Sequence, residues 1–163
     1  MTIVAKRAFI EEIEAVYRRR GADFFRFALA RTGDRERALD AVQEGFARSI
    51  RSRATFRGSG PLEAWIARCV INAAKDAKTN AGTPTVDERG PGATPEVGSL
   101  ALIVREAVHE LPQRQRDVLF LRHYLDLDYT AIAAALGIEI GTVSATLHAA
   151  RAALAEALQE VPL

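Results

Sequence analysis

The sequence has little of several features that would place a small protein in a class at once. Its 163 residues include one cysteine, Cys69, which excludes an internal disulfide and a cysteine zinc site. No apolar run approaches the roughly 20 residues that span a bilayer. Residues 1–14 are charged and lack the apolar core of a signal peptide. We therefore expect a cytoplasmic protein without membrane insertion.

Signatures of catalysis are also missing. The three histidines, His109, His123 and His148, lack metal-ligand spacing. The sequence contains no glycine-rich phosphate-binding loop and no nucleophile–base signature. We expect a protein that is not an enzyme and that has no catalytic residue, no metal site and no cofactor.

Charge is nearly balanced overall but unevenly distributed along the chain. The formal net charge is +1, yet residues 1–80 hold 16 Lys and Arg against 10 Asp and Glu. Residues 101–163 hold 5 against 8. Basic side chains supply most of the attraction for nucleic acid, so we expect that attraction mainly in the first half.

Apolar residues recur at helical spacing in both halves, and no alternating strand pattern is present. Between the halves lies a stretch rich in glycine and proline that has no apolar period. We predict an all-α protein with two small helical domains, at residues 1–80 and 100–163, joined by a flexible linker at 81–99.

Four helices are predicted in the first half. The first covers residues 3–19, the second begins at a capping Asp23 and stops near Gly33, and the third is capped by Asp34. The fourth starts at Pro61 and fades after Lys78. Its apolar stripe includes Trp65, which we interpret as a core residue rather than a platform for stacked bases.

Residues 128–154 contain two apolar helical patterns around a short turn. Ala133 is small where two helices must approach, Gly137 falls at the end of the first helix, and Val143 points back between them. This spacing is typical of a DNA-binding helix-turn-helix. The alternative is an ordinary corner between two helices of a bundle.

The motifs in both halves resemble those of one family. The second half contains Leu111-Pro-Gln-Arg-Gln-Arg-Asp-Val-Leu119, then Tyr129, Ile132-Ala133 and Gly141-Thr-Val143. The first half contains Thr32-Gly-Asp34, Asp40-Ala-Val-Gln-Glu-Gly-Phe46, Phe56-Arg-Gly58 and Ala64-Trp-Ile-Ala-Arg68, with Asn72 and Asp76. In this order, they are similar to the central and C-terminal domains of bacterial RNA polymerase sigma factors of the extracytoplasmic-function (ECF) group.

The resemblance implies a sigma region 2-like domain at 1–80, which docks on core polymerase and meets the promoter's minus-ten element. Docking would use the third-helix surface, where polar groups flank an apolar stripe suited to a directional interface. The alternative is a solvated helix face. The polymerase-binding residues implied are Asp40, Gln43, Glu44 and Arg48.

The resemblance places minus-ten recognition in the loop at 56–62 and on the fourth helix. An opened strand needs new partners for its bases, and the amide of Asn72 can donate to and accept from a base edge. The basic side chains can meet phosphates, although they could equally form a solubilising surface. The residues implied are Arg57, Arg68, Asn72, Lys75 and Asp76.

A sigma region 4-like domain at 100–163 would place a recognition helix, from Thr142 to about Leu158, on the minus-thirty-five element. Here the sequence departs from the family, because many relatives carry Lys or Arg at the positions of Ser144, Thr146 and Ala149. Few phosphate contacts imply low affinity and a shallow salt dependence. The residues implied are Arg114, Thr142, Ser144, Ala145, Thr146, His148 and Arg151.

The function implied is transcription initiation: binding core RNA polymerase, directing it to promoter DNA and aiding strand opening. An anti-sigma factor that masks both domains is a further partner common in the family. Two alternatives stay open. One is a stand-alone helix-turn-helix regulator that binds duplex DNA without polymerase. The other is a protein-interaction module with a sigma-like fold that has lost DNA recognition. The low charge of the recognition helix leaves this alternative open.

Overall fold

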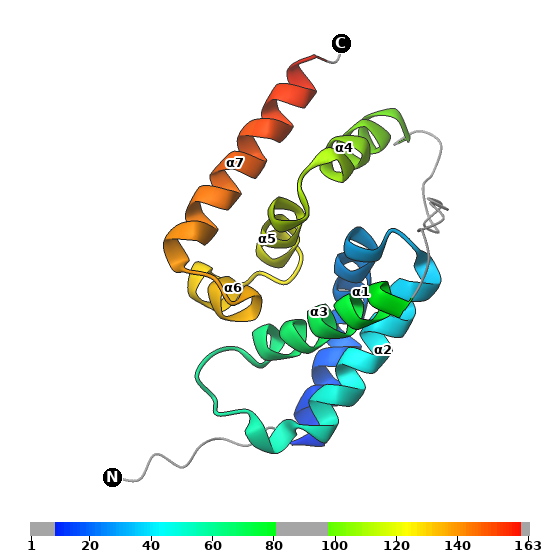
Figure 1. The fold of residues 1–163 in the computed structure, drawn as a ribbon, viewed down its shortest axis with the longest axis vertical. Helices are drawn as coiled ribbons and strands as arrows, with labels where there is room; N and C mark the ends of the chain where they lie inside the picture. Colours follow the sequence, from blue (N-terminus) through cyan, green and yellow to red (C-terminus); the bar gives the residue numbers. More distant parts are fainter. Residues whose placement is uncertain (1–8, 81–97, 161–163) are drawn as a thin grey trace.

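The computed structural model describes residues 9–80 and 98–160, which form two helical lobes (Figure 1). The first lobe contains α1 (Ile10–Thr32), α2 (Arg35–Arg51), a short 3-10 turn (Arg53–Thr55) and α3 (Leu62–Asn80). The second contains α4 (Gly98–Glu110), α5 (Gln113–His123), α6 (Tyr129–Leu136) and α7 (Ile140–Gln159). The all-α prediction is confirmed over the described residues. Residues 81–97 of the predicted linker, and the start of the helix predicted at 3–19, lie outside them.

The first lobe departs from the prediction at its first helix. Two helices were expected on either side of Gly21, but α1 runs without a break to Thr32. Buried residues continue at helical spacing across this point, with Val16 before it and Phe24 after it. Burial of this stripe outweighs the modest helical cost of one glycine, about 1 kcal/mol. The helix ends instead at Gly33, whose left-handed φ of 69° closes the last turn.

The other helix boundaries follow local signals. Asp34 accepts a hydrogen bond from the backbone N–H of Glu36 and caps α2 as predicted. The rings of Phe24 and Phe46 meet edge-on at 5.2 Å, which ties α1 to α2 in the core. Two large apolar side chains of this lobe, Tyr17 and Leu39, are 49% and 41% exposed.

A glycine sets the distance between α2 and α3. A Cβ atom at Gly45 would lie 2.6 Å from the Cα of Val70 and 2.9 Å from its backbone nitrogen. No side chain fits that space, so the two helices pack almost backbone to backbone. The polymerase-facing candidates on α2 and the DNA-facing candidates on α3 therefore belong to one tightly joined pair of helices.

The two lobes also contact each other, which was not expected from the sequence. Helix α1 packs against α5, and α3 packs against α6. One cluster of buried apolar residues continues from the first lobe, which contributes Phe27 and Ile71, to the second, which contributes Val118 and Ile132. Figure 1 shows the second lobe standing across one side of α1 and α3.

Within the described residues, no single helix is long and apolar enough to cross a membrane. Helices α6 and α7 pass that test only when taken together, and they are bent by 101° at the break between them.

Candidate polymerase and nucleic-acid interfaces

The α2 surface predicted to bind polymerase presents its polar side chains outward. Asp40 and Gln43 are exposed, while Glu44 and Arg48 are half-buried beside them. The opposite side of the helix buries Ala38, Val42 and Phe46 in the lobe's core. The exposed polar edge is therefore held in place by a packed apolar face, which gives a partner a rigid surface to meet.

An ion-pair network joins this edge to α3. The Glu44 carboxylate accepts from Arg48 Nε at 3.0 Å and from Arg51 Nη2 at 2.8 Å. These hydrogen bonds lower the pKa of Glu44. Arg48 also reaches Asp76 Oδ2 at 2.8 Å, and its bonds to Glu44 and Asp76 raise the pKa of the guanidinium. The network thus links a residue predicted for the minus-ten element to two predicted for polymerase.

The α3 surface predicted to meet the minus-ten element is exposed and basic. Arg68, Asn72 and Lys75 lie one turn apart along the helix, and all three are exposed. Arg57 is exposed in the loop that precedes α3. Trp65 is partly buried and packs against Phe56, with ring centroids 5.5 Å apart. Trp65 therefore packs against the edge of the core and is not fully buried within it.

A cleft of about 350 Å³ lies between this surface and the second lobe. Arg68, Asn72 and Lys75 line one side, and Arg114 and the end of α6 at Leu136–Gly137 line the other. Arg114 was grouped with the minus-thirty-five residues, but the structure brings it to the minus-ten group. The reason is that the start of α5 faces the first lobe.

The helix-turn-helix has the predicted geometry. Asp128 caps α6 by accepting from the N–H of Ala131 at 2.8 Å. Gly137 has a left-handed φ of 68° at its end. Ala133 is 7% exposed and Val143 is fully buried, as their places between the two helices require. The turn then directs α7 at 101° to α6.

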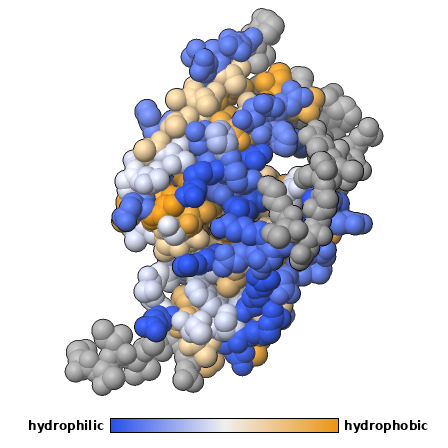
Figure 2. All heavy atoms as spheres, viewed as in Figure 1, coloured by the Kyte–Doolittle hydropathy of each residue, from blue (hydrophilic) through white to orange (hydrophobic). Residues whose placement is uncertain are grey.

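The start of α7 presents a surface of small polar side chains. One face of α7 is fully buried, through Val143, Leu147 and Ala150. The opposite face of the helix is therefore directed to solvent. Figure 2 shows apolar surface beside the turn, where Ile140 is 50% exposed. Thr146 is half-buried, and the other predicted contact residues of α7 are exposed: Thr142, Ser144, Ala145, His148 and Arg151.

Two residues outside the predicted sites form a buried ion pair between the lobes. Arg31, in the last turn of α1, pairs with Asp117 on α5. Their side chains are 13% and 5% exposed. Burial raises the pKa of Asp117, against the opposing effect of Arg31 and of a 2.9 Å hydrogen bond from Gln113. The sequence contained one signal for this pair: Asp117 places a charge directly beside Val118, which belongs to an apolar stripe.

Comparison with known families agrees with this arrangement. The family model described as "Sigma-70 region 2" matches residues 16–83, and that described as "Sigma-70, region 4" matches residues 101–154. The ECF RNA polymerase sigma factor SigL of Mycobacterium tuberculosis is 31% identical over 159 residues, which cover 91% of this chain and 90% of SigL. The RNA polymerase sigma-H factor of Pseudomonas aeruginosa is 28% identical over 145 residues, covering 77% and 75% of the two chains.

Solved structures share the fold. The sigma factor RpoE of Bartonella quintana, in complex with the anti-sigma factor NepR, superposes with a TM-score of 0.73 at 21% identity, covering 93% of this chain and 99% of RpoE. CnrH in complex with the cytosolic domain of CnrY gives 0.71 at 21%, covering 95% and 92%. The 31% identity to SigL over most of both chains, together with the two region matches in this order, shows that the chain belongs to the ECF group of RNA polymerase sigma factors.

Proposed function

We propose that the two lobes of this transcription initiation factor divide promoter recognition between α3 and α7, while α2 holds the polymerase. As a sigma factor the chain binds core RNA polymerase and promoter DNA. The sigma factors are not a class of enzymes. The observation that carries the division of roles is that the candidate residues of α2 and α3 occupy two adjacent exposed faces of one packed helix pair.

On α3 the proposed roles follow from chemistry. Asn72 offers one amide donor group and one acceptor to the edge of an unpaired base. Arg68 and Lys75, one turn to either side, supply cations for the flanking phosphates. Arg57 approaches from the preceding loop. Asp76 is engaged with Arg48, so its proposed role is to fix α3 against α2 beside the bases.

On α2 the proposed docking edge has two parts. Asp40 and Gln43 are exposed, and Glu44 and Arg48 are held by the ion-pair network that reaches α3. An interface of this kind relies on hydrogen bonds around a buried apolar centre. The exposed Leu39 lies next to Asp40 and offers such a centre. This combination supports docking over a purely solvated face.

On α7 the proposed contacts are weaker. Thr142, Ser144 and Thr146 supply hydroxyls, Ala145 supplies a methyl group, and the N–H groups of the helix start can meet a phosphate. Arg151 and the weakly basic His148 complete the surface. Binding to the minus-thirty-five element should therefore contribute less free energy than the α3 contacts.

The proposed site of action is the cytoplasm, and an anti-sigma factor is a proposed partner. Its support is that RpoE of Bartonella quintana, which shares the fold, was solved with an anti-sigma factor. Helix α4 and the end of α7 leave Leu102 and Leu158 48% and 38% exposed, which a protein partner could cover.

The deciding experiment mixes the purified chain with core RNA polymerase and a genomic promoter library. We expect initiation from a defined set of start sites that depends on the added chain. Polymerase binding without initiation at any site would favour an interaction module instead. Stable binding to duplex DNA in the absence of polymerase would favour a stand-alone regulator.

A further inference from the structure

The cleft beside α3 has the size of a small-molecule site and an unusually polar lining. Its volume of about 350 Å³ lies within the range of roughly 300–1,000 Å³ that ligand pockets occupy. Most such pockets are apolar and contain a few polar groups. Here seven of the eleven described residues that line the cleft are charged or carry an amide. A ligand that matches this lining is therefore small and highly charged.

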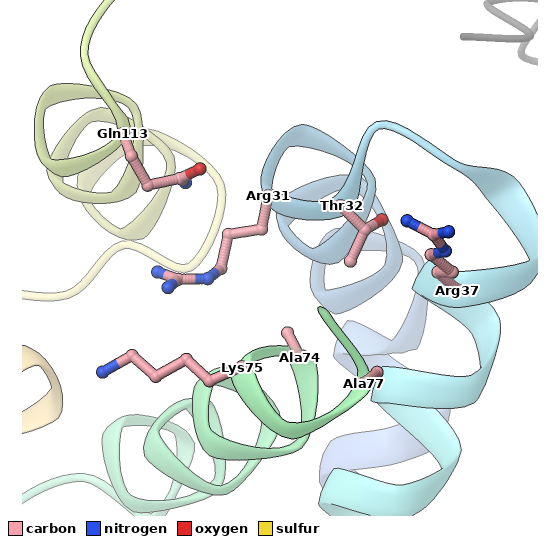
Figure 3. Close-up of a pocket in the computed structure, with 7 residues that line it drawn as sticks. All are labelled: Arg31, Thr32, Arg37, Ala74, Lys75, Ala77 and Gln113. Atoms are coloured by element: carbon pink, nitrogen blue, oxygen red, sulfur yellow. The ribbon is translucent and has the colours of Figure 1, made fainter. Parts of the chain in front are cut away.

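Positive charge dominates the lining. Three helices supply its cations: Arg31 on α1, Arg68 and Lys75 on α3, and Arg114 on α5. Figure 3 shows Arg31 and Lys75 extending in the same direction, from α1 and α3, into a space that Gln113 borders. Charges of one sign around a concave surface reinforce one another and attract small counter-ions. The arrangement therefore favours an anion.

Two negative groups oppose these cations without cancelling them. The carboxylate of Asp117 lines the cleft, but it is buried and already accepts from Arg31 and Gln113. The end of α6 at Gly137 contributes the negative end of a helix dipole, which is equivalent to about half a charge. Four full positive charges against about one and a half negative charges leave the lining net positive.

The cations are spread along the cleft. Arg68 and Lys75 are seven residues apart on α3, which separates their Cα atoms by about 10 Å along the helix axis at roughly 1.5 Å per residue. Linked phosphate groups can meet both side chains where they stand, whereas a single phosphate would require the two to converge. Guanidinium groups also bind phosphate oxygens in pairs. The spacing therefore favours a chain of phosphates over one phosphate.

The lining differs from that of a site for single-stranded nucleic acid. Such sites stack successive bases on aromatic side chains, from which they gain much of their affinity. Among the described residues that line the cleft, none is aromatic. The cleft therefore favours phosphate groups over bases.

We propose that this cleft binds a small oligophosphate anion, a chain of two or three linked phosphate groups. Such a chain occurs as an inorganic ion and as the phosphate tail of a nucleotide, and both would use the same cations. Arg68, Lys75 and Arg114 are exposed, so the ligand can enter from solvent. The proposal goes beyond promoter recognition and does not rest on it, although Arg68 and Lys75 belong to both sites.

The test measures binding of sodium tripolyphosphate to the full chain by isothermal titration calorimetry at about 0.15 M salt. Arg114→Ala removes one cation of the cleft at an exposed position. The matched control is Arg18→Ala, the same change at a side chain that is 75% exposed and outside the lining. Nitrogen-15 NMR spectra locate the ligand by comparing the amide of Gly137, which lines the cleft, with that of Gly141, which does not.

We expect one tripolyphosphate per chain and a shift of the Gly137 amide but not of Gly141. Arg114→Ala should weaken binding about tenfold, because one charge-assisted contact to phosphate is lost. Adding Lys75→Ala should weaken it further, and Arg18→Ala should match the unaltered chain. Inorganic phosphate should bind at least about tenfold more weakly than tripolyphosphate.

A nucleoside triphosphate identifies the source of the phosphate chain. Without an aromatic platform for the base, it should bind within about threefold of tripolyphosphate. A nucleoside triphosphate that binds more than about tenfold tighter would support the same site with a nucleotide as its ligand.

Three results would overturn the proposal. The first is the absence of saturable binding, and the second is inorganic phosphate binding as tightly as tripolyphosphate. The third is an equal loss in Arg18→Ala and Arg114→Ala, which would show a general effect of net charge. None of these results decides the role of α3 at the minus-ten element, which the effect of Asn72→Ala on promoter opening tests separately.

Discussion

The two surfaces proposed to meet DNA differ in how they would bind it. On α3 an amide stands between two exposed cations, Arg68 and Lys75. On α7 the exposed surface near the turn has hydroxyl and methyl groups, and Arg151 is its one full cation. Phosphate contacts dominate affinity, and contacts to base edges give sequence preference. From this difference we expect the first lobe to supply most of the free energy of DNA binding and the second lobe to contribute less.

The two lobes also differ in the space around a helical glycine, which is closed at Gly45 and open at Gly141. The prediction with the largest expected effect tests this difference. Gly45→Ala should lower the free energy of unfolding by about 1–3 kcal/mol, because its Cβ would meet the backbone of Val70. Gly141→Ala, in the first turn of α7 with open space around it, should be neutral or stabilise by up to about 1 kcal/mol. Chemical denaturation measures both, and equal effects would contradict the comparison.

The next effect concerns the α3 amide. Asn72→Ala should reduce promoter opening about tenfold while polymerase affinity stays within error, because a base-edge contact is worth about 1–3 kcal/mol. Permanganate reactivity of the opened strand and a polymerase binding titration make the measurement. Equal loss of opening and of polymerase binding would reject the assignment of Asn72 to the minus-ten element.

A third prediction separates α2 from α3. The double variant Asp40→Ala with Gln43→Ala should weaken polymerase docking by about 1–2 kcal/mol, as loss of central interface contacts does. Its helical content should not change, because both side chains are exposed. Competition for core polymerase against the unaltered chain measures docking. Unaltered affinity would show that this face is merely solvated.

A fourth prediction concerns the smaller number of cations on α7 than on α3. Ser144→Arg should add one phosphate contact and steepen the salt dependence of holoenzyme binding to duplex upstream DNA by about one unit in slope. Ser144→Gln, which has a long neutral side chain, is the control. A slope unchanged by the arginine would place Ser144 away from the DNA backbone.

The smallest effect concerns acidity at the buried pair. The pKa of Asp117 is raised above the ordinary 3.8 of an aspartate, so the folded chain takes up this proton at a higher pH than the unfolded chain. That contribution to stability is present below pH 3.8 and is lost as pH rises through the raised pKa. Asp117→Asn should lack this component, which unfolding titrations at several pH values would show as a difference in slope.

Local signals predicted the elements better than the contacts between them. Ala133, Gly137 and Val143 predicted the helix-turn-helix because each has a steric reason to occupy its place. Gly21 led to a wrong helix boundary, because a glycine followed by a capping aspartate usually ends a helix. Here the burial of Phe24 outweighed that local signal. The Arg31–Asp117 pair spans 86 positions. No local rule relates such residues, although a charge beside Val118 in an apolar stripe indicates a buried partner.

The close approach at Gly45 has a mechanical consequence. Because the backbones of α2 and α3 nearly touch there, the two helices cannot slide along each other without a clash against Val70. This contact therefore fixes the spacing between the proposed polymerase-docking edge of α2 and the proposed base-reading surface of α3. A larger side chain at Gly45 would therefore shift these two surfaces relative to each other, although Gly45 belongs to neither.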